Sequence, residues 1–351
     1  MRACARILPM AVLAFVVACG PSGGDSRAGD TGGEASAIPP STPVPSGEGS
    51  ILRLSPRFSS LVPPGAVIEK VAEGFTFIEG PVWIREDSQL LFSDVRGNAI
   101  HRFSDAAGTG LFIEAFFGGS QEGRRTWGPN GLTRDAMGRL VVADQGRRQI
   151  TRIEADGSYT ALATSYDGRR LNSPNDVVYR SDGWLYFTDP PYGLEGLDES
   201  PLKELPFNGI YRLGPSGELQ LLSREQLRPN GLAFSPDEST LYVANSDAAR
   251  ALWMAYDVGP GGLSNARVFH DATGWPEDGV PDGMKVDVAG NLFATGPGGV
   301  WVIAPDGTHL GIIQPGELPA NVGFADDGRT LYMTARTGLY RIRLSTEGGI
   351  P

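Results

Sequence analysis

The sequence predicts an all-β protein, a six-bladed β-propeller with a central metal site, and three observations support this. A short turn motif with one polar side chain, followed by an apolar run, recurs six times along the chain. The copies are spaced by about 40 to 55 residues, a period typical of propeller blades. The chain contains 48 glycines and 27 prolines and has no convincing long amphipathic helix, which favours a turn-dense β fold.

Each repeat unit begins with the turn motif and continues with a second apolar run. The polar residue stands at the same place in every motif: Glu79, Asn130, Asn175, Asn230, Asp282 and Asn321. The second runs resemble one another and cover residues 90–94, 140–144, 185–189, 241–245, 292–296 and 331–335. Turn signals such as Ser181-Asp182-Gly183 precede most of these runs. Short β-rich runs divided by such turns predict antiparallel hairpins, with roughly four strands in each unit.

A propeller ring also needs a strand that ties its last blade to its first. Residues 66–71 form a β-rich run ahead of the first motif, and we expect them to close the blade at residues 319–344. Closure of this kind leaves few exposed strand edges. An unclosed pair of β-sheets is the alternative architecture, and six copies in phase argue against it.

The first residues have the features of an export signal. Arg2 and Arg6 accompany an apolar stretch at residues 7–18, which is too short to span a bilayer but suits a signal peptide. Small residues followed by Cys19 resemble the bacterial lipoprotein cleavage site, which implies a signal peptide at residues 1–18 and lipidation of Cys19. Ordinary secretion with a chance cysteine is the alternative. We therefore expect a bacterial cell-envelope protein that meets the membrane through its lipid anchor only.

Composition predicts where the folded domain begins and which class of partner the protein does not bind. Residues 19–51 are rich in Gly, Ser and Pro and predict a flexible tether, so the propeller would occupy residues 52–351. The two cysteines are Cys4 and Cys19, so the propeller folds without a disulfide. The net charge of −11 argues against a nucleic-acid partner. No pattern indicates an oligomeric state.

The six motif residues comprise two carboxylates and four amides. Oxygen ligands of this kind suit a hard divalent cation. A turn by itself gives no reason for Glu79 and Asp282 to occupy the repeat position of the amides. We therefore expect one divalent cation on the ring axis, held by Glu79, Asn175, Asn230 and Asp282.

Ca²⁺ is the first expectation for this cation, with Mg²⁺, Mn²⁺ or Zn²⁺ as alternatives. Zn²⁺ normally prefers His or Cys ligands. The histidines of the chain, His101, His270 and His309, lie far apart and outside the motifs, so we do not expect a zinc site of the usual kind.

The motifs together resemble the gluconolactonase family, which includes senescence marker protein and luciferin-regenerating enzyme. The similarity covers about residues 66–344. It is carried by residues 79–83, 91–94, 170–178, 187–193, 228–237 and 281–284. The resemblance implies a six-bladed propeller with one catalytic divalent metal in its central channel. It places the metal ligands at Glu79, Asn175, Asn230 and Asp282, and makes Asp282 the catalytic acid/base.

The reaction implied by this resemblance is hydrolysis of a lactone or related ester, such as a sugar lactone. The metal would hold the substrate carbonyl oxygen and stabilise the negative charge that develops on it. Asp282 would deprotonate the attacking water or attack the carbonyl directly. The substrate would be a small molecule, and the sequence does not identify which lactone.

Four residues are expected to contact this substrate: Asn130, Trp127, Gln145 and Tyr192. Trp127 precedes Asn130 by three residues and would wall the channel mouth. Many bacterial members that resemble this chain carry His near position 145, and Gln145 cannot titrate near neutral pH as His does. Gln145 is therefore a candidate for substrate specificity, or else a turn residue. The long loops at residues 105–127 and 190–207 are also expected to select the substrate.

Two other functions remain open at this point. The same oxygen ligands serve phosphotriester hydrolysis in related propellers. A tethered propeller can also bind a partner in the cell envelope without catalysis, with a structural Ca²⁺ in its ring.

Overall fold

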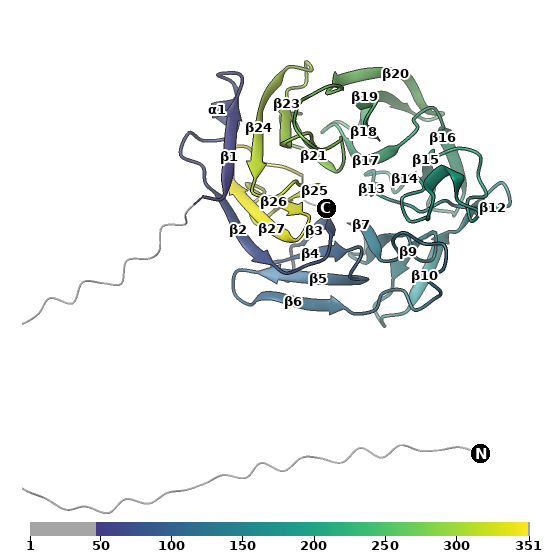
Figure 1. The fold of residues 1–351 in the computed structure, drawn as a ribbon. Coiled ribbons are helices and arrows are strands. Elements are labelled where there is room, and N and C mark those ends of the chain that lie inside the picture. Colours follow the sequence, from purple (N-terminus) through teal and green to yellow (C-terminus); the bar gives the residue numbers. More distant parts are fainter. Residues whose placement is uncertain (1–46, 350–351) are drawn as a thin grey trace, which may run out of the picture. The chain divides into compact units, whose positions relative to one another are not determined.

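A computed structural model describes residues 47–349 of the chain. The expected signal peptide, Cys19 and most of the expected tether lie outside this range. Figure 1 shows six antiparallel sheets arranged as a ring, and the all-β, six-bladed prediction is confirmed. No helix within residues 47–349 has the length and apolarity needed to cross a membrane.

The first three blades follow the order of the chain from the axis outward. Blade 1 contains β3 (Ile78–Ile84), β4 (Gln89–Asp94), β5 (Ala99–Ser104) and β6 (Gly108–Ile113). Blade 2 contains β7 (Pro129–Arg134), β8 (Leu140–Asp144), β9 (Gln149–Ile153) and β10 (Tyr159–Ala163). Blade 3 contains β13 (Val177–Tyr179), β14 (Leu185–Asp189), β15 (Gly209–Leu213) and β16 (Leu219–Ser223). A small hairpin of β11 (Ser165–Tyr166) and β12 (Arg169–Arg170) separates blades 2 and 3.

The last three blades include both N-terminal strands. Blade 4 contains β17 (Pro229–Phe234), β18 (Thr240–Asp247), β19 (Arg250–Gly259) and β20 (Gly262–Asp271). Blade 5 contains β21 (Met284–Val286), β22 (Leu292–Gly296), β23 (Gly299–Ile303), β24 (His309–Pro315) and, outermost, β1 (Gly49–Arg53). Blade 6 contains β25 (Asn321–Ala325), β26 (Thr330–Ala335), β27 (Gly338–Arg343) and, outermost, β2 (Ile68–Glu73).

Ring closure occurs where the sequence predicts it. Strand β2 pairs antiparallel with β27, with Ile68 opposite Ile342. Blade 6 then packs on blade 1, since Tyr332 and Leu339 share one buried cluster with Phe92. The ring is therefore closed, and the alternative of two unclosed sheets does not apply.

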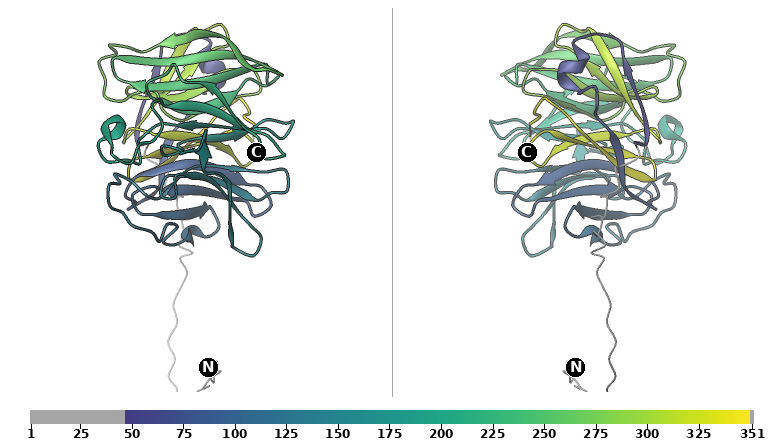
Figure 2. Two further views of the ribbon diagram at one scale, coloured as in Figure 1. Left: turned by 90° about the vertical axis from the view of Figure 1, so that its right-hand side faces the viewer. Right: turned by 90° about the vertical axis from the view of Figure 1, so that its left-hand side faces the viewer.

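Strand β1 adds a feature that the sequence did not indicate. It pairs with β24 and gives blade 5 a fifth strand, with Leu52 opposite Ile312. Strand pairing thus begins at Gly49, shortly before the expected domain boundary at residue 52. The helix α1 (Phe58–Leu61) follows and buries Phe58. Figure 2 shows β1 and α1 at the periphery of the ring.

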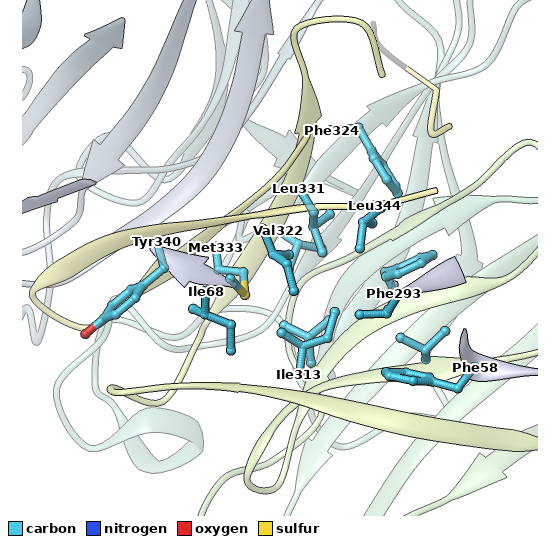
Figure 3. Packing of buried hydrophobic residues seen from close by; sticks show 14 of the residues in the cluster. Phe58, Ile68, Phe293, Ile313, Val322, Phe324, Leu331, Met333, Tyr340 and Leu344 are labelled. Carbon is cyan, nitrogen blue, oxygen red and sulfur yellow. The ribbon is translucent and has the colours of Figure 1, made fainter. Parts of the chain in front are cut away.

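Hydrophobic packing holds neighbouring blades together. Six buried apolar clusters are present in the described part of the chain, and each contains side chains from two adjacent blades. Figure 3 shows the cluster between blades 5 and 6, where Phe293 and Ile313 meet Val322 and Met333. Alternation along the strands explains this arrangement, because successive side chains face opposite neighbours. Val141 packs toward blade 3, whereas Val142 packs toward blade 1.

Candidate active site

The six motif residues lie at the axial ends of the innermost strands. Glu79, Asn130 and Asn230 are the second residues of β3, β7 and β17, and Asn321 begins β25. Asn175 and Asp282 stand two residues before β13 and β21. Figure 1 places all six strands around the centre of the ring. Asp282 is partly exposed, and the other five side chains are buried.

Hydrogen bonds connect the motif side chains of neighbouring blades. The amide of Asn130 donates to Asn175 Oδ1 at 2.8 Å, and the amide of Asn175 donates to Asn230 Oδ1 at 2.5 Å. The amide of Asn321 donates to Glu79 Oε2 at 3.0 Å. An amide oxygen that accepts one hydrogen bond keeps a second lone pair. The amide oxygens of Asn175 and Asn230 are therefore oriented by their neighbours and still able to bind a ligand.

Glycines allow the motifs to approach each other so closely. An added Cβ at Gly131 would lie 2.5 Å from Asp176 Oδ1, and one at Gly231 would lie 2.4 Å from the Asp282 carbonyl oxygen. The Gly131 N–H also donates to the Asn175 carbonyl oxygen at 2.8 Å. Gly131 and Gly231 are thus required for close approach between blades.

The carboxyl groups at the axis lie where negative charge is costly. Burial raises the pKa of Glu79 to about 7, although the Gly80 N–H and the Asn321 amide oppose this shift. Burial, then the charge of Glu79 and then that of Asp176, raise the pKa of Asp282 well above its usual range. Glu79 and Asp282 are therefore close enough to influence one another. A bound cation would relieve this repulsion.

The donor set at the axis fits a hard cation. Asn130 Oδ1 is buried and accepts no hydrogen bond from any described residue. Within residues 47–349, no group of three or more His, Cys, Asp or Glu side chains could hold a metal. Two carboxylates therefore need amide oxygens to complete a coordination shell, and amide oxygens are acceptable ligands for Ca²⁺.

Two residues at the axis were not among the sequence candidates. Asp176 is buried, and its Oδ2 accepts a hydrogen bond from the Leu232 N–H at 3.3 Å. Ser246 Oγ accepts a hydrogen bond from the Asn230 amide at 2.8 Å and donates one to the Pro281 carbonyl. A signal for Asp176 was present in the sequence, because it replaces the glycine that follows the polar residue in four other motifs.

Tyr192 directs its hydroxyl toward the motif residues. Burial is the main reason that its pKa is raised, and the nearby charge of Asp282 adds to the effect. Asn230 and Ser246 are also neighbours of the hydroxyl. Nevertheless Oη is buried and has no hydrogen-bond partner of normal geometry among the described residues. A buried phenol without a partner next to a carboxylate is a candidate for contact with substrate.

The remaining substrate candidates lie in loops that pack on one another. Gln145 is buried, and its Oε1 accepts a hydrogen bond from Thr126 Oγ1 at 2.5 Å. An added Cβ at Gly146 would lie 2.3 Å from the Trp127 carbonyl oxygen. These contacts bring the loop of Trp127 and the turn of Gln145 together.

The turn that carries Tyr192 joins the same assembly. Residues Arg124 and Leu194 form an isolated β-bridge, and the Gly193 N–H donates to Ser173 Oγ at 2.8 Å. Of the two expected substrate loops, residues 105–127 include strand β6, and residues 190–207 include a 3₁₀ turn, η1 (Leu197–Glu199). Trp127, Gln145 and Tyr192 therefore come from segments of blades 1 to 3 that contact one another.

The expectation that all three histidines lie far apart is wrong for one pair. The rings of His270 and His309 have centroids 5.5 Å apart, and His309 stacks on Trp301 at 3.9 Å. Burial, followed by the charge of His270, lowers the pKa of His309 to about 4. Neither histidine belongs to the motif residues.

A cavity of about 930 Å³ opens on the axis beyond the motif residues. Its lining includes residues that follow the motifs on the innermost strands of all six blades: Val82, Leu132, Val177, Leu232, Lys285 and Gly323. The cavity therefore lies at the opposite end of the axis from the loops of Trp127 and Tyr192.

Comparison with known proteins identifies relatives of this chain. A gluconolactonase from Zymomonas mobilis is 39% identical over 313 residues, which cover 86% of this chain and 87% of that protein. A solved gluconolactonase structure from Xanthomonas campestris has a TM-score of 0.75 and 32% identity, and covers 88% of this chain and 99% of its own. Diisopropyl-fluorophosphatase from Loligo vulgaris is 28% identical over 210 residues, or 57% of this chain and 66% of that protein.

The family model described as "SMP-30/Gluconolactonase/LRE-like region" matches residues 77–337. This range begins just before the first motif residue and ends after the last blade's β26, so it includes all six motifs. The resemblance seen in the motifs is confirmed, and the chain belongs to the SMP-30/gluconolactonase/LRE-like family.

Proposed function

We propose that this protein is a divalent-cation-dependent hydrolase of sugar lactones or closely related esters. The observation that carries the proposal is the ring of carboxylate and amide oxygens at the axis. Hydrogen bonds join these side chains between neighbouring blades, and burial and the charge of Glu79 raise the pKa of Asp282. The relatives named as gluconolactonases support the substrate class.

Glu79, Asn175, Asn230 and Asp282 are the residues that would hold the cation. When bound, the cation would supply Lewis-acid polarisation of the lactone carbonyl. Ca²⁺ suits a site made only of carboxylate and amide oxygens, and Mg²⁺, Mn²⁺ and Zn²⁺ are the alternatives. The hydrogen bonds from Asn130 to Asn175 and from Asn175 to Asn230 orient these amide oxygens before any ligand arrives.

Asp282 is the proposed general base. Its carboxylate takes a proton from water as the water oxygen bonds to the acyl carbon. The bond between the acyl carbon and the ring oxygen then breaks, and the ring oxygen receives the proton, so that the product is an open-chain hydroxy acid. Tyr192 Oη would donate a hydrogen bond to a substrate oxygen, since it has no hydrogen-bond partner of normal geometry among the described residues.

Direct attack by Asp282 on the acyl carbon is the alternative route. Single-turnover hydrolysis in isotopically labelled water distinguishes the two. General-base catalysis leaves the Asp282 peptide unlabelled, whereas attack of water on the Asp282 carbonyl of an acyl-Asp282 anhydride incorporates the label into the carboxylate.

The main test compares lactone hydrolysis by the wild type and by Asp282→Asn. We expect turnover to fall by about a thousandfold, because the variant loses both the base and one cation ligand. Asp237→Asn, at an exposed hairpin turn, is the matched control and should keep full activity. Treatment of the wild type with a chelator should abolish turnover, and added Ca²⁺ should restore it.

Full activity of a folded Asp282→Asn variant would contradict the proposed mechanism. A wild type that binds Ca²⁺ but hydrolyses no lactone in a panel of sugar lactones would instead favour the non-catalytic binding propeller.

Phosphotriester hydrolysis at the same site is a second candidate, favoured by the similarity to diisopropyl-fluorophosphatase. Assaying a phosphotriester alongside the lactones ranks the two activities. A kcat/KM for the phosphotriester above that for every lactone would reverse the assignment.

We also propose that Cys19 is lipidated and attaches the protein to the bacterial cell envelope. The apolar stretch at residues 7–18 and the small residues before Cys19 support this. The intact mass of protein from the membrane fraction should show acyl groups on an N-terminal Cys19. We expect the Cys19→Ser variant to carry no acyl groups and to appear in the soluble fraction. A wild-type protein that is bound to the membrane without acyl groups would contradict the proposal.

A further inference from the structure

A third carboxylate lies at the axis beside the proposed cation ligands. Asp176 is 4% exposed, and its Oδ1 accepts a hydrogen bond from the Val177 N–H at 2.9 Å. Its Oδ2 accepts a hydrogen bond from the Leu232 N–H in blade 4. Its Oδ1 lies 2.5 Å from the position of an added Cβ at Gly131 in blade 2. A single side chain thus contacts three adjacent blades.

The charge of Asp176 acts on the other two carboxylates. It raises the pKa of Glu79 and that of Asp282, in each case after the larger effect of burial. The axis therefore holds three mutually repelling carboxylates rather than the two that the motif pattern indicates.

Lys285 is the cation closest to this group in the sequence, three residues after Asp282 on the innermost strand of blade 5. It is half-buried and lines the axial cavity together with Val177 and Leu232. Its Nζ donates to the Met284 carbonyl oxygen at 3.0 Å.

The other lysines of the chain form ion pairs away from the axis. Lys70 pairs with Glu73 and Glu317, and Lys203 lies 3.8 Å from Asp198. The ammonium of Lys285 instead acts on the axial carboxylates, since its charge opposes the rise in the pKa of Asp176 and of Glu79.

When all three carboxylates are ionised, a divalent cation balances the charge of this group. Without a cation, the raised pKa values of Glu79 and Asp282 favour protonation instead. Glu79, Asp176 and Asp282 contribute three negative charges, and Lys285 contributes one positive charge. Two further positive charges complete the balance. We propose that Asp176 and Lys285 are positioning charges that set the affinity of the axial site for its divalent cation without binding it. This inference rests on the cation site of the proposed function.

The sign of each effect follows from electrostatics. Asp176 attracts a cation at the axis and Lys285 repels it, and both act through a protein interior that screens charge weakly. Removing the carboxylate should weaken cation binding, and removing the ammonium should strengthen it. A merely structural role for Asp176 as an acceptor of backbone N–H groups predicts no such opposite pair. Asparagine keeps only one of the two acceptor oxygens, but the loss of one hydrogen bond gives no reason for Lys285→Met to tighten cation binding.

The experiment measures Ca²⁺ affinity by isothermal titration calorimetry on chelator-stripped protein. The variants are Asp176→Asn, Lys285→Met, the double variant and Lys70→Met. We expect binding to weaken about tenfold in Asp176→Asn and to tighten about tenfold in Lys285→Met. The double variant should return to within about threefold of the wild type. Lys70→Met removes the same charge from outermost strand β2 and should leave the affinity unchanged.

Near-ultraviolet circular dichroism of each apo variant establishes that it is folded. Lys285 is half-buried, so Lys285→Met keeps the test decisive even if Asp176→Asn does not fold. An affinity for Ca²⁺ in Lys285→Met that equals the wild type, or falls below it, overturns this inference while lactone hydrolysis stands. A wild type that binds no divalent cation overturns the inference and the proposed function together.

Discussion

The axis of the ring and the interfaces between its blades differ in the polarity of their buried side chains. At the interface of blades 5 and 6, Phe293, Val300 and Met333 are fully buried and apolar. At the axis, Glu79 and Asp176 are almost as buried but carry carboxylates. Burying apolar surface stabilises the fold, whereas burying mutually repelling charge costs stability.

This contrast indicates where stability and function reside. A protein can retain costly charge at its centre only if packing elsewhere offsets it, and the six inter-blade clusters are suited to that role. Disturbing an interface should therefore change stability with little effect on chemistry. Disturbing the axis should instead abolish the chemistry, and should change stability through the cation that the axis would hold.

The largest stability effect is expected at an interface. Phe293→Ala removes a fully buried ring between blades 5 and 6 and should lower the free energy of unfolding by about 3–5 kcal/mol. Urea denaturation of cation-saturated protein measures this. The kcat of the folded fraction should stay close to that of the wild type. A loss below about 1 kcal/mol would show that this interface contributes little.

Removing the cation should affect stability nearly as much. At a Ca²⁺ concentration about 100 times Kd, binding stabilises the folded state by about 2.7 kcal/mol. Chelation should lower the unfolding temperature of the wild type and leave Asp282→Asn almost unchanged. An equal response of both proteins to chelator would place the stabilising ion somewhere other than the axis.

Two buried tyrosine hydroxyls allow a matched comparison of the axis with an interface. Tyr192 Oη and Tyr186 Oη both lack a hydrogen-bond partner among the described residues, but Tyr186 belongs to the cluster between blades 3 and 4. Tyr192→Phe should lower kcat about tenfold, because it removes one hydrogen bond to substrate. Tyr186→Phe should leave kcat unchanged. Equal activity of the two variants would remove Tyr192 from the catalytic site.

The smallest expected effect concerns pH and an interface histidine. Burial lowers the pKa of His309 to about 4, so the unfolded chain takes up a proton near pH 6.5 that the folded state resists. The contribution of His309 to stability is therefore complete above pH 6.5 and is lost as pH falls toward 4. Comparing urea unfolding of wild type and His309→Phe across this range should show a shallower pH dependence in the variant. Identical slopes would mean that His309 is already protonated in the folded protein or does not titrate in this range.

The repeat made most of the fold predictable. Strand-like runs at a fixed period specify blades, because each unit can bury its two faces only against similar neighbours. The run at residues 66–71 was assigned to blade 6 because the ring needs a closing strand, and β2 occupies that place. Strand β1 was not predicted, since its few residues do not specify which sheet edge they will join.

At the axis, the sequence alone determined which residues share a repeat position, and so placed Glu79 and Asp282 among four amides. Tertiary structure decided what else lies beside them. Asp176 and Lys285 belong to different blades. His270 and His309 both contact Trp301, His270 edge-to-face and His309 stacked. Periodicity encodes contacts that recur in every unit, whereas contacts made once depend on distances that arise only when the ring closes.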